Sequence, residues 1–267
     1  MESKFIKISS GKLHYTISGS GNTLMLIHGF GEDGTIWAIQ ENILSEKYSL
    51  IIPDLPGSGK SDFMKMENGN VQLTDYAEII NDILLAEKIE SLVMIGHSMG
   101  GYIALAFAEK YPQKLKGLGL FHSSAFPDNE EKIDTRRKAI EFIKVNGPKE
   151  FLKTSIPGLY AESFRASHPG EVEAHLNAAK FTIETLIQYY EAMIQRPDRT
   201  AVLKTVSFPV LFIIGELDQA VPLEQSLRQC HIPKISHIHL LPEVAHMGMI
   251  EAPDETVKFI DEFLQNI

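Results

Sequence analysis

Short apolar runs alternate with segments of helical period along most of the chain. The runs are rich in Ile, Leu and Val and occupy Phe5–Ile8, Leu13–Ile17, Leu24–His28, Leu50–Pro53, Leu92–Ile95, Leu115–Phe121, Val210–Ile214 and Ile235–Leu241. Segments with helical period cover Ile36–Leu44, Leu73–Leu85, Met99–Ala108, Leu223–Gln229 and Glu255–Leu264. Alternating strands and helices predict an α/β fold: a mostly parallel eight-stranded sheet with helices on both faces. The first two runs, joined at Ser10 and Gly11, predict an antiparallel hairpin at its edge.

The alternation is interrupted once, between residues 124 and 201. Only helical patterns occur there, such as "TRRKAIEFIKVNG" and "TIETLIQYYEAMIQR". A helical insertion between two buried strands is expected to cover the strand ends, which would otherwise face water. The predicted organisation is therefore a core of residues 1–123 and 202–267, with residues 124–201 as an inserted all-helical cap.

Composition and charge narrow the classes of partner. The chain has 267 residues, 44% hydrophobic and 22% charged, which is ordinary for a globular protein. Its net charge of −10 should repel nucleic acid and anionic membranes. Cys230 is the single cysteine, which excludes an internal disulfide and any multi-cysteine metal site. Because the N-terminus lacks an apolar signal core and no run is long enough to span a bilayer, the protein is expected to be cytoplasmic.

The stretch "IGHSMGGY" places a serine between two glycines where a strand gives way to a helix. A serine can present its hydroxyl above the sheet there only if the turn is very sharp, and Gly96 and Gly100 permit that turn. Isolated glycines are also common in ordinary turns. With a strand before it and a helix after it, we interpret Ser98 as a nucleophile.

A serine hydroxyl needs a base to take its proton, and a histidine is the usual one. His246 is the preferred candidate, because it lies in a loop between the last strand and the last helix and can return to the strand ends. His28 and His97 are interpreted as packing or turn-bracing residues. His237 and His239 share a strand face without a third ligand, so no metal is predicted.

The histidine in turn needs a carboxylate on its other nitrogen to fix tautomer and orientation. Asp218 follows a buried strand in "GELDQAVP", one helix and one strand before His246, and is the preferred acid. Glu216 in the same loop and Asp128 after the preceding strand are its rivals.

A tetrahedral intermediate needs two backbone N–H groups directed at its oxygen. Met99 supplies one at the start of the helix after the serine, where the positive end of the helix assists. In "HGFG", Gly29 permits a sharp turn that leaves the N–H of Phe30 free as the second. The sequence "HGFG" is also compatible with an ordinary tight loop.

One motif imitates a phosphate-binding loop. "PDLPGSGKSD" ends in Gly59, Lys60 and Ser61 after a strand. The phosphate-loop pattern requires a glycine where Asp54 stands and a helix directly after the serine. Nucleotide binding is therefore not expected, and no cofactor is predicted.

With serine, acid and histidine in that order on an alternating strand and helix pattern, the chain resembles the α/β-hydrolase superfamily. "GHSMGG" resembles its nucleophile elbow, "HGFG" its oxyanion loop, "DLPGSGKS" its D-x-x-G-x-G-x-S loop, "GELDQAVP" its acid loop and "AHMGMIEAP" its histidine loop. The resemblance implies hydrolysis through an acyl-enzyme, with Ser98 attacking, His246 shuttling the proton and Asp218 orienting it. It also implies that residues 124–201 are the cap, which mostly decides the substrate.

The predicted function is hydrolysis of a small, largely apolar carboxylic ester without a cofactor. The same three residues would also serve a carbon–carbon bond hydrolase, a thioesterase or a lactonase. A small-molecule receptor or signalling protein of the same fold is the alternative from another class. A serine at the nucleophile position argues against dehalogenases and epoxide hydrolases of this fold, which use aspartate.

Apolar side chains of the insertion and of the loops are expected to line the substrate pocket. The candidates are Phe126, Tyr160, Tyr189, Met193 and Met247 first, then Phe30, Met99, Phe151, Phe164, Tyr190 and Met249. Arg136 and Arg137 are expected to face water, and "RPDR" is expected to pair its arginines with Asp198. An arginine facing inward would instead select a substrate that carries a carboxylate, so neutral short acyl esters are favoured.

Overall fold

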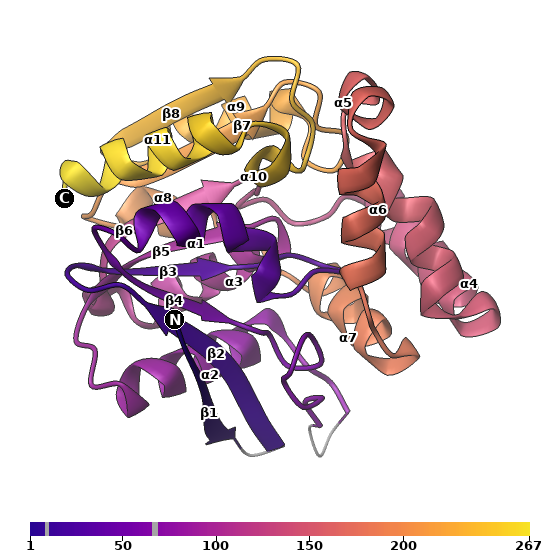
Figure 1. Ribbon diagram of the computed structural model, residues 1–267, viewed down its shortest axis with the longest axis horizontal. Helices are drawn as coiled ribbons and strands as arrows, with labels where there is room; N and C mark the ends of the chain where they lie inside the picture. Colours follow the sequence, from indigo (N-terminus) through magenta and orange to yellow (C-terminus); the bar gives the residue numbers. More distant parts are fainter. Residues whose placement is uncertain (9–10, 66–68) are drawn as a thin grey trace.

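A single eight-stranded sheet forms the centre of the computed structural model, which describes residues 1–8, 11–65 and 69–267 (Figure 1). Its strands run in the order β1-β2-β4-β3-β5-β6-β7-β8. The strands are β1 (Glu2–Ile8), β2 (Gly11–Ser18), β3 (Thr23–Ile27), β4 (Ser49–Pro53), β5 (Leu92–His97), β6 (Leu115–Phe121), β7 (Val210–Gly215) and β8 (Ser236–Leu241).

The sheet is parallel from β4 to β8, and β2 runs antiparallel to both of its neighbours, β1 and β4. The mostly parallel eight-stranded sheet is thus confirmed. The antiparallel pairing of β1 with β2 at the edge is confirmed as well, with Glu2 opposite Ile17. Ser10, expected in the connecting turn, lies outside the described residues.

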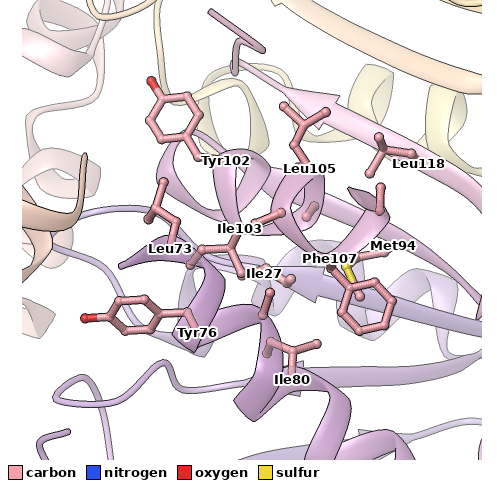
Figure 2. Packing of buried hydrophobic residues seen from close by; sticks show 14 of the residues in the cluster. Ile27, Leu73, Tyr76, Ile80, Met94, Tyr102, Ile103, Leu105, Phe107 and Leu118 are labelled. Atoms are coloured by element: carbon pink, nitrogen blue, oxygen red, sulfur yellow. The ribbon is translucent and has the colours of Figure 1, made fainter. Parts of the chain in front are cut away.

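Helices cover both faces of the sheet because its central strands are apolar on both sides. In β3, Met25 and Ile27 belong to the cluster under α2 (Leu73–Ala86) and α3 (Met99–Lys110), whereas Leu24 and Leu26 face α1 (Ala38–Leu44) and α11 (Pro253–Gln265). Figure 2 shows the first cluster. The remaining elements of the core are η1 (Gly34–Trp37), η2 (Pro112–Lys114), α8 (Thr200–Thr205), α9 (Leu223–Cys230) and α10 (Gly248–Glu251).

The helical insertion, residues 124–201, contains no strand, and all of its residues are described. Its helices gather at one side of the molecule, beyond the carboxyl ends of the parallel strands (Figure 1). They are α4 (Glu130–Ser155), η3 (Ile156–Leu159), α5 (Glu162–Ser167), α6 (Pro169–Ala178) and α7 (Ile183–Ile194).

The longest of these helices, α4, is kinked at Gly147, whose φ of 81° is not helical and which precedes Pro148. A glycine can adopt this backbone conformation without the strain that a side chain would add. In the described part of the chain, no helix combines the length and the apolar character needed to cross a membrane.

Candidate active site

Ser98 lies in the turn between β5 and α3 with strained backbone angles, φ 49° and ψ −113°. A non-glycine residue in such a conformation costs about 1–3 kcal/mol and persists only where surrounding contacts impose it. Here the Ser98 N–H donates to the carbonyl of Phe121 at 3.0 Å, and the Ser98 carbonyl accepts from Gly101 N at 3.0 Å and Ser123 Oγ at 2.7 Å. These three bonds fix the turn that holds the serine hydroxyl at the end of the strand.

The glycines around Ser98 are required because backbone passes directly beside each of them. A Cβ on Gly96 would overlap the backbone of Gly100 and Gly101, and one on Gly100 would overlap the carbonyl oxygen of Ile27. A sharp turn at Ser98 requires small residues on both sides of the serine. The structure supplies the reason: strand, turn and helix backbones are in contact here.

His246 and Asp218 are hydrogen-bonded to each other at the carboxyl end of the sheet. Nδ1 of His246 lies 2.8 Å from Oδ2 of Asp218, and both side chains are buried. Oδ1 of Asp218 accepts from Ala220 N at 2.8 Å and Val221 N at 2.9 Å, so both carboxylate oxygens have donors. Because an ionised carboxylate only accepts, the hydrogen sits on Nδ1 and Nε2 of His246 is left as the basic nitrogen.

The charges of this pair stabilise each other. Burial opposes ionisation of Asp218, but the adjacent His246 and His122 outweigh it and hold the pKa of Asp218 well below its usual range. Burial also disfavours the charged form of His246, and the Asp218 carboxylate reverses this and raises the pKa of His246. The arrangement favours an imidazole that becomes protonated beside a permanently ionised carboxylate.

The two rival acids have other partners. Glu216 is exposed and accepts a hydrogen bond from Glu243 N at 3.2 Å. Asp128 is buried between two arginines, with Oδ2 at 2.6 Å from Arg136 Nε and Oδ1 at 2.9 Å from Arg196 Nη2. Only Asp218, among the three acids considered, has a carboxylate oxygen bonded to His246.

His122, a residue that the sequence reasoning did not single out, lies behind the pair. Its Nδ1 accepts from Gly215 N at 3.1 Å and is 3.5 Å from Oδ2 of Asp218. Burial lowers the pKa of His122 to about 4, although Asp218 acts in the opposite direction. His122 is therefore neutral at pH 7 and leaves the carboxylate charge to His246. Like Ser98 it directly follows a central strand, which is the signal that could have found it.

His122, Asp218 and His246 are also the one group in the described residues whose atoms lie close enough to hold a metal ion, within 4.8 Å of one another. Their contacts argue against that use. The facing atoms of Asp218 and His246 are bonded to each other, and Nδ1 of His122 is bonded to the backbone. His237 and His239 instead pack on Phe263 and Phe259.

A buried pair, Glu32 and His97, connects the loop after β3 to the end of β5 and to the loop that carries His246. Oε2 of Glu32 accepts from Gly29 N at 2.7 Å and faces Nδ1 of His97 at 3.0 Å. Nε2 of His97 lies 3.0 Å from the carbonyl oxygen of His246. In the described part of the chain, the N–H groups of Phe30 and Met99 donate no hydrogen bond to other protein atoms. Both expected oxyanion donors are thus free of protein partners.

The helical insertion also holds the histidine loop. The N–H of His246 donates to the carbonyl of Leu159 at 2.9 Å. The carboxylate of Glu251 accepts from Ala161 N at 2.9 Å and from Met247 N at 3.0 Å, joining the start of α5 to the residue after His246. The position of the base therefore depends on the insertion as well as on the sheet.

A cavity of about 290 Å³ lies between the insertion and the sheet and is lined by both Ser98 and His246. Of the five pocket residues expected first, Met193 lines it. Phe126, Tyr160, Tyr189 and Met247 are not among its lining residues. Phe30 and Tyr190, which stack with ring centroids 4.3 Å apart, do line it.

The four other candidates are used for packing. The hydroxyl of Tyr189 donates to the Pro56 carbonyl at 2.9 Å, and that of Tyr160 is bonded to His175. Met247 is fully buried in the core, and the ring of Phe126 lies under the guanidinium of Arg228. Sequence pattern alone does not distinguish an apolar side chain in a core from one in a cavity.

The arginines of the insertion differ from expectation. Arg137 faces water, with 67% of its side chain exposed, but Arg136 is only 13% exposed and lines the cavity. The arginines of "RPDR" do not pair with Asp198. Arg196 binds Asp128 and Arg199 binds Glu109, while Asp198 accepts from Thr200 N. The expectation that Arg136 faces water was therefore wrong, because buried Asp128 draws it inward.

The loop that imitates a phosphate-binding motif closes on a carboxylate of its own. Asp54 accepts from Lys60 N at 2.8 Å and from Gly34 N at 2.9 Å, and a side chain on Gly59 would overlap it. His28 braces the same loop, since its Nε2 accepts from Leu55 N at 2.9 Å. These contacts assign the loop and His28 a structural role.

The chain is similar in sequence and in fold to known hydrolases. A family model for the alpha/beta hydrolase fold matches residues 22–143. Lipase 1 of Psychrobacter immobilis is 29% identical over 266 residues, which cover 96% of this chain and 82% of that lipase. A thermophilic esterase from Thermogutta terrifontis superposes with a TM-score of 0.91 at 29% identity, covering 100% of this chain and 99% of the esterase. The enol-lactonase from Burkholderia xenovorans, at 20% identity and a TM-score of 0.90, covering 98% of this chain and 100% of its own, shares the fold.

The sheet order, the strained serine turn and these similarities define an α/β-hydrolase fold. The protein is a hydrolase whose relatives include lipases and esterases.

Proposed function

We propose that the protein is a serine hydrolase that cleaves a small carboxylic ester, largely apolar around its carbonyl, through an acyl-enzyme. The observation that carries the proposal is the 2.8 Å bond between His246 Nδ1 and Asp218 Oδ2 beside a cavity that Ser98 also lines. Ester hydrolysis is also the reaction of a lipase and of an esterase, the two proteins that this chain resembles over most of its length. The helical insertion, residues 124–201, is the proposed cap over a core of residues 1–123 and 202–267.

In the proposed mechanism Ser98 Oγ attacks the ester carbonyl carbon while its proton passes to Nε2 of His246. The oxygen of the tetrahedral intermediate accepts hydrogen bonds from the N–H groups of Phe30 and Met99. The intermediate then expels the alcohol, which takes the proton from His246. Water then attacks the carbonyl carbon of the acyl-enzyme and gives a proton to Nε2 of His246. The second tetrahedral intermediate expels Ser98 Oγ, which takes this proton back from His246, and the carboxylic acid leaves. Asp218 stays ionised throughout and stabilises the imidazolium.

The apolar preference rests on the walls of the cavity. Its apolar lining residues include Phe30 from the loop after β3 and Leu152, Ile156, Leu159 and Met193 from the insertion. Each methylene of an acyl chain buried against such walls contributes about 0.8 kcal/mol until the space is full.

Covalent labelling tests the nucleophile. Wild type and Ser98→Ala are incubated with a fluorophosphonate, and the adduct is mapped by mass spectrometry beside turnover of a panel of esters, thioesters and lactones. We expect a single adduct on Ser98 and a loss of about 10⁴- to 10⁶-fold in kcat for the alanine variant. Labelling at another residue, or full activity without the Ser98 hydroxyl, would contradict the proposal. A preference for thioesters or lactones would leave Ser98 as the proposed nucleophile and replace the carboxylic ester as the proposed substrate class.

A further inference from the structure

Two cationic side chains of α4 face the cavity that contains Ser98. Lys132 and Arg136 are four residues apart, so they lie on one face of the helix, and both line the cavity. The Arg136 guanidinium is held between Asp128, with Nε at 2.6 Å from Oδ2, and the ring of Tyr190, whose centroid is 5.4 Å away. The arginine is therefore fixed in place before any substrate arrives.

The positive charge at this end of the cavity exceeds the negative charge that faces it. Asp128 is shared by Arg136 and Arg196, so one carboxylate serves two guanidinium groups. Lys132 donates to the carbonyl oxygen of Ala220 at 2.6 Å and has no carboxylate partner among the described residues. The acid that does line the cavity, Glu32, is bound to His97.

This local excess contrasts with the whole molecule, which carries a net charge of −10. Partial burial in the cavity weakens the hydration of the Lys132 and Arg136 charges, so leaving them there without an anion is unfavourable. A ligand anion would restore the balance through charge-assisted hydrogen bonds, for which the planar guanidinium of arginine is well suited.

We propose that Lys132 and Arg136 form a subsite for a carboxylate carried by the substrate, so that the enzyme acts on half-esters of small dicarboxylic acids. The inference rests on the proposed ester hydrolysis and adds the class of ester. The chain between ester and carboxylate lies along the apolar walls of the cavity, and the carboxylate binds at α4. Residues that only hold the anion contribute mainly to binding, and their loss raises KM more than it lowers kcat.

Matched substrate series test the subsite. The kcat/KM values of monomethyl esters of dicarboxylic acids from succinate to suberate are compared with those of methyl alkanoates of the same carbon number. We expect the wild type to prefer the charged ester at one chain length. Arg136→Gln should lower the ratio of charged to neutral kcat/KM by about 10- to 100-fold at that length, and Lys132→Met by about tenfold.

Arg137→Gln is the matched control, because it removes the same charge from the same helix at a side chain that is 67% exposed. It should leave the ratio at the wild-type value. An equal loss for both series in Arg136→Gln would mean that the arginine only holds α4 against Asp128, and would overturn the inference. If Arg136→Gln does not fold, Lys132→Met decides in the same way, because the Lys132 bond is to a carbonyl oxygen only.

Binding separates this inference from the proposed function. Ser98→Ala is titrated with monomethyl adipate and with methyl hexanoate by calorimetry. Tighter binding of the charged ester that is lost when Arg136→Gln is added to Ser98→Ala supports the subsite. This conclusion holds even if the wild type turns over no ester, since absence of turnover would reject only the proposed hydrolysis. Equal turnover and equal binding of the two esters would reject the subsite and leave ester hydrolysis in place.

Discussion

Replacing Glu32 by glutamine tests whether a buried charge holds the oxyanion loop. Glu32 accepts from Gly29 N and faces Nδ1 of His97, whose Nε2 must carry a hydrogen because the His246 carbonyl only accepts. One carboxylate oxygen can accept from Gly29 N and from a hydrogen on Nδ1 of His97 at once. The amide oxygen of glutamine can take the same place, but it is neutral and loses the coulombic attraction between Glu32 and His97.

The size of the effect follows from the environment of the carboxylate. Burial would raise the pKa of Glu32, but His97 and the Gly29 N–H lower it from 4.5 to about 2. At about 1.4 kcal/mol per pKa unit, this corresponds to about 3 kcal/mol of stability. Glu32→Gln should therefore lower the melting temperature by about 6–12 °C. Because Glu32 touches Gly29 and not the reacting atoms, kcat should fall by about tenfold, less than the 10²–10³ for losing an oxyanion donor itself, with KM little changed.

Thermal unfolding at several pH values provides the assay. Because the pKa is lower in the folded protein, the stabilisation is complete above about pH 4.5 and is lost as the pH falls towards 2. The gap between wild type and variant should narrow over that range. Asp33→Asn is the control, since it changes the charge of the next residue, which caps η1 and lies outside the Glu32 pair. A variant as stable as wild type at pH 7, or a gap that does not change with pH, would refute the reasoning.

Three further predictions concern the proposed triad and its turn. Asp218→Asn should lower kcat by about 10⁴-fold, as in a protease triad, because the amide favours the wrong tautomer of His246, whereas Glu216→Gln should keep activity; the reverse order would remove Asp218 from its proposed role. The kcat/KM should rise with pH and level off, with a midpoint above about 6.5 because Asp218 raises the pKa of His246 and only the neutral imidazole accepts a proton; a midpoint below 6.5 in a pH profile would contradict this. Gly100→Ala should lower the free energy of unfolding in denaturant by about 3 kcal/mol or more, because its Cβ meets the carbonyl oxygens of Ile27 and His28. Gly158→Ala, where nothing lies within 4 Å of the new Cβ, should change that free energy by less than about 0.5 kcal/mol, and equal values for the two variants would show that the turn relaxes.

Much of the fold could be predicted because its signals are local. Each strand of the sheet coincides with an apolar run, and each core helix named in advance has a helical period. Parallel strands end at a common edge, so residues just beyond them are candidates to meet. Ser98, Asp218 and His246 could be proposed for this reason, before any contact between them was known.

The pocket could not be predicted in the same way. Tyr189 and Tyr190 are neighbours in one helix, yet the first donates to Pro56 in the core and the second lines the cavity. Helical period indicates which side chains share a face, but both core and cavity are apolar. Which side chains of the helix face the core and which face the cavity is set by its packing against segments distant in sequence.

The same limit applies to charge. Sequence alone establishes a net charge of −10, an apolar strand pattern and a serine between glycines. Only the tertiary structure decides that Arg136 turns inward to Asp128 and that Glu32 meets His97 across 65 residues of chain. The physical reason is that a charged side chain is stabilised by whichever opposite charge the fold brings to it, and that neighbour has no fixed spacing in the sequence.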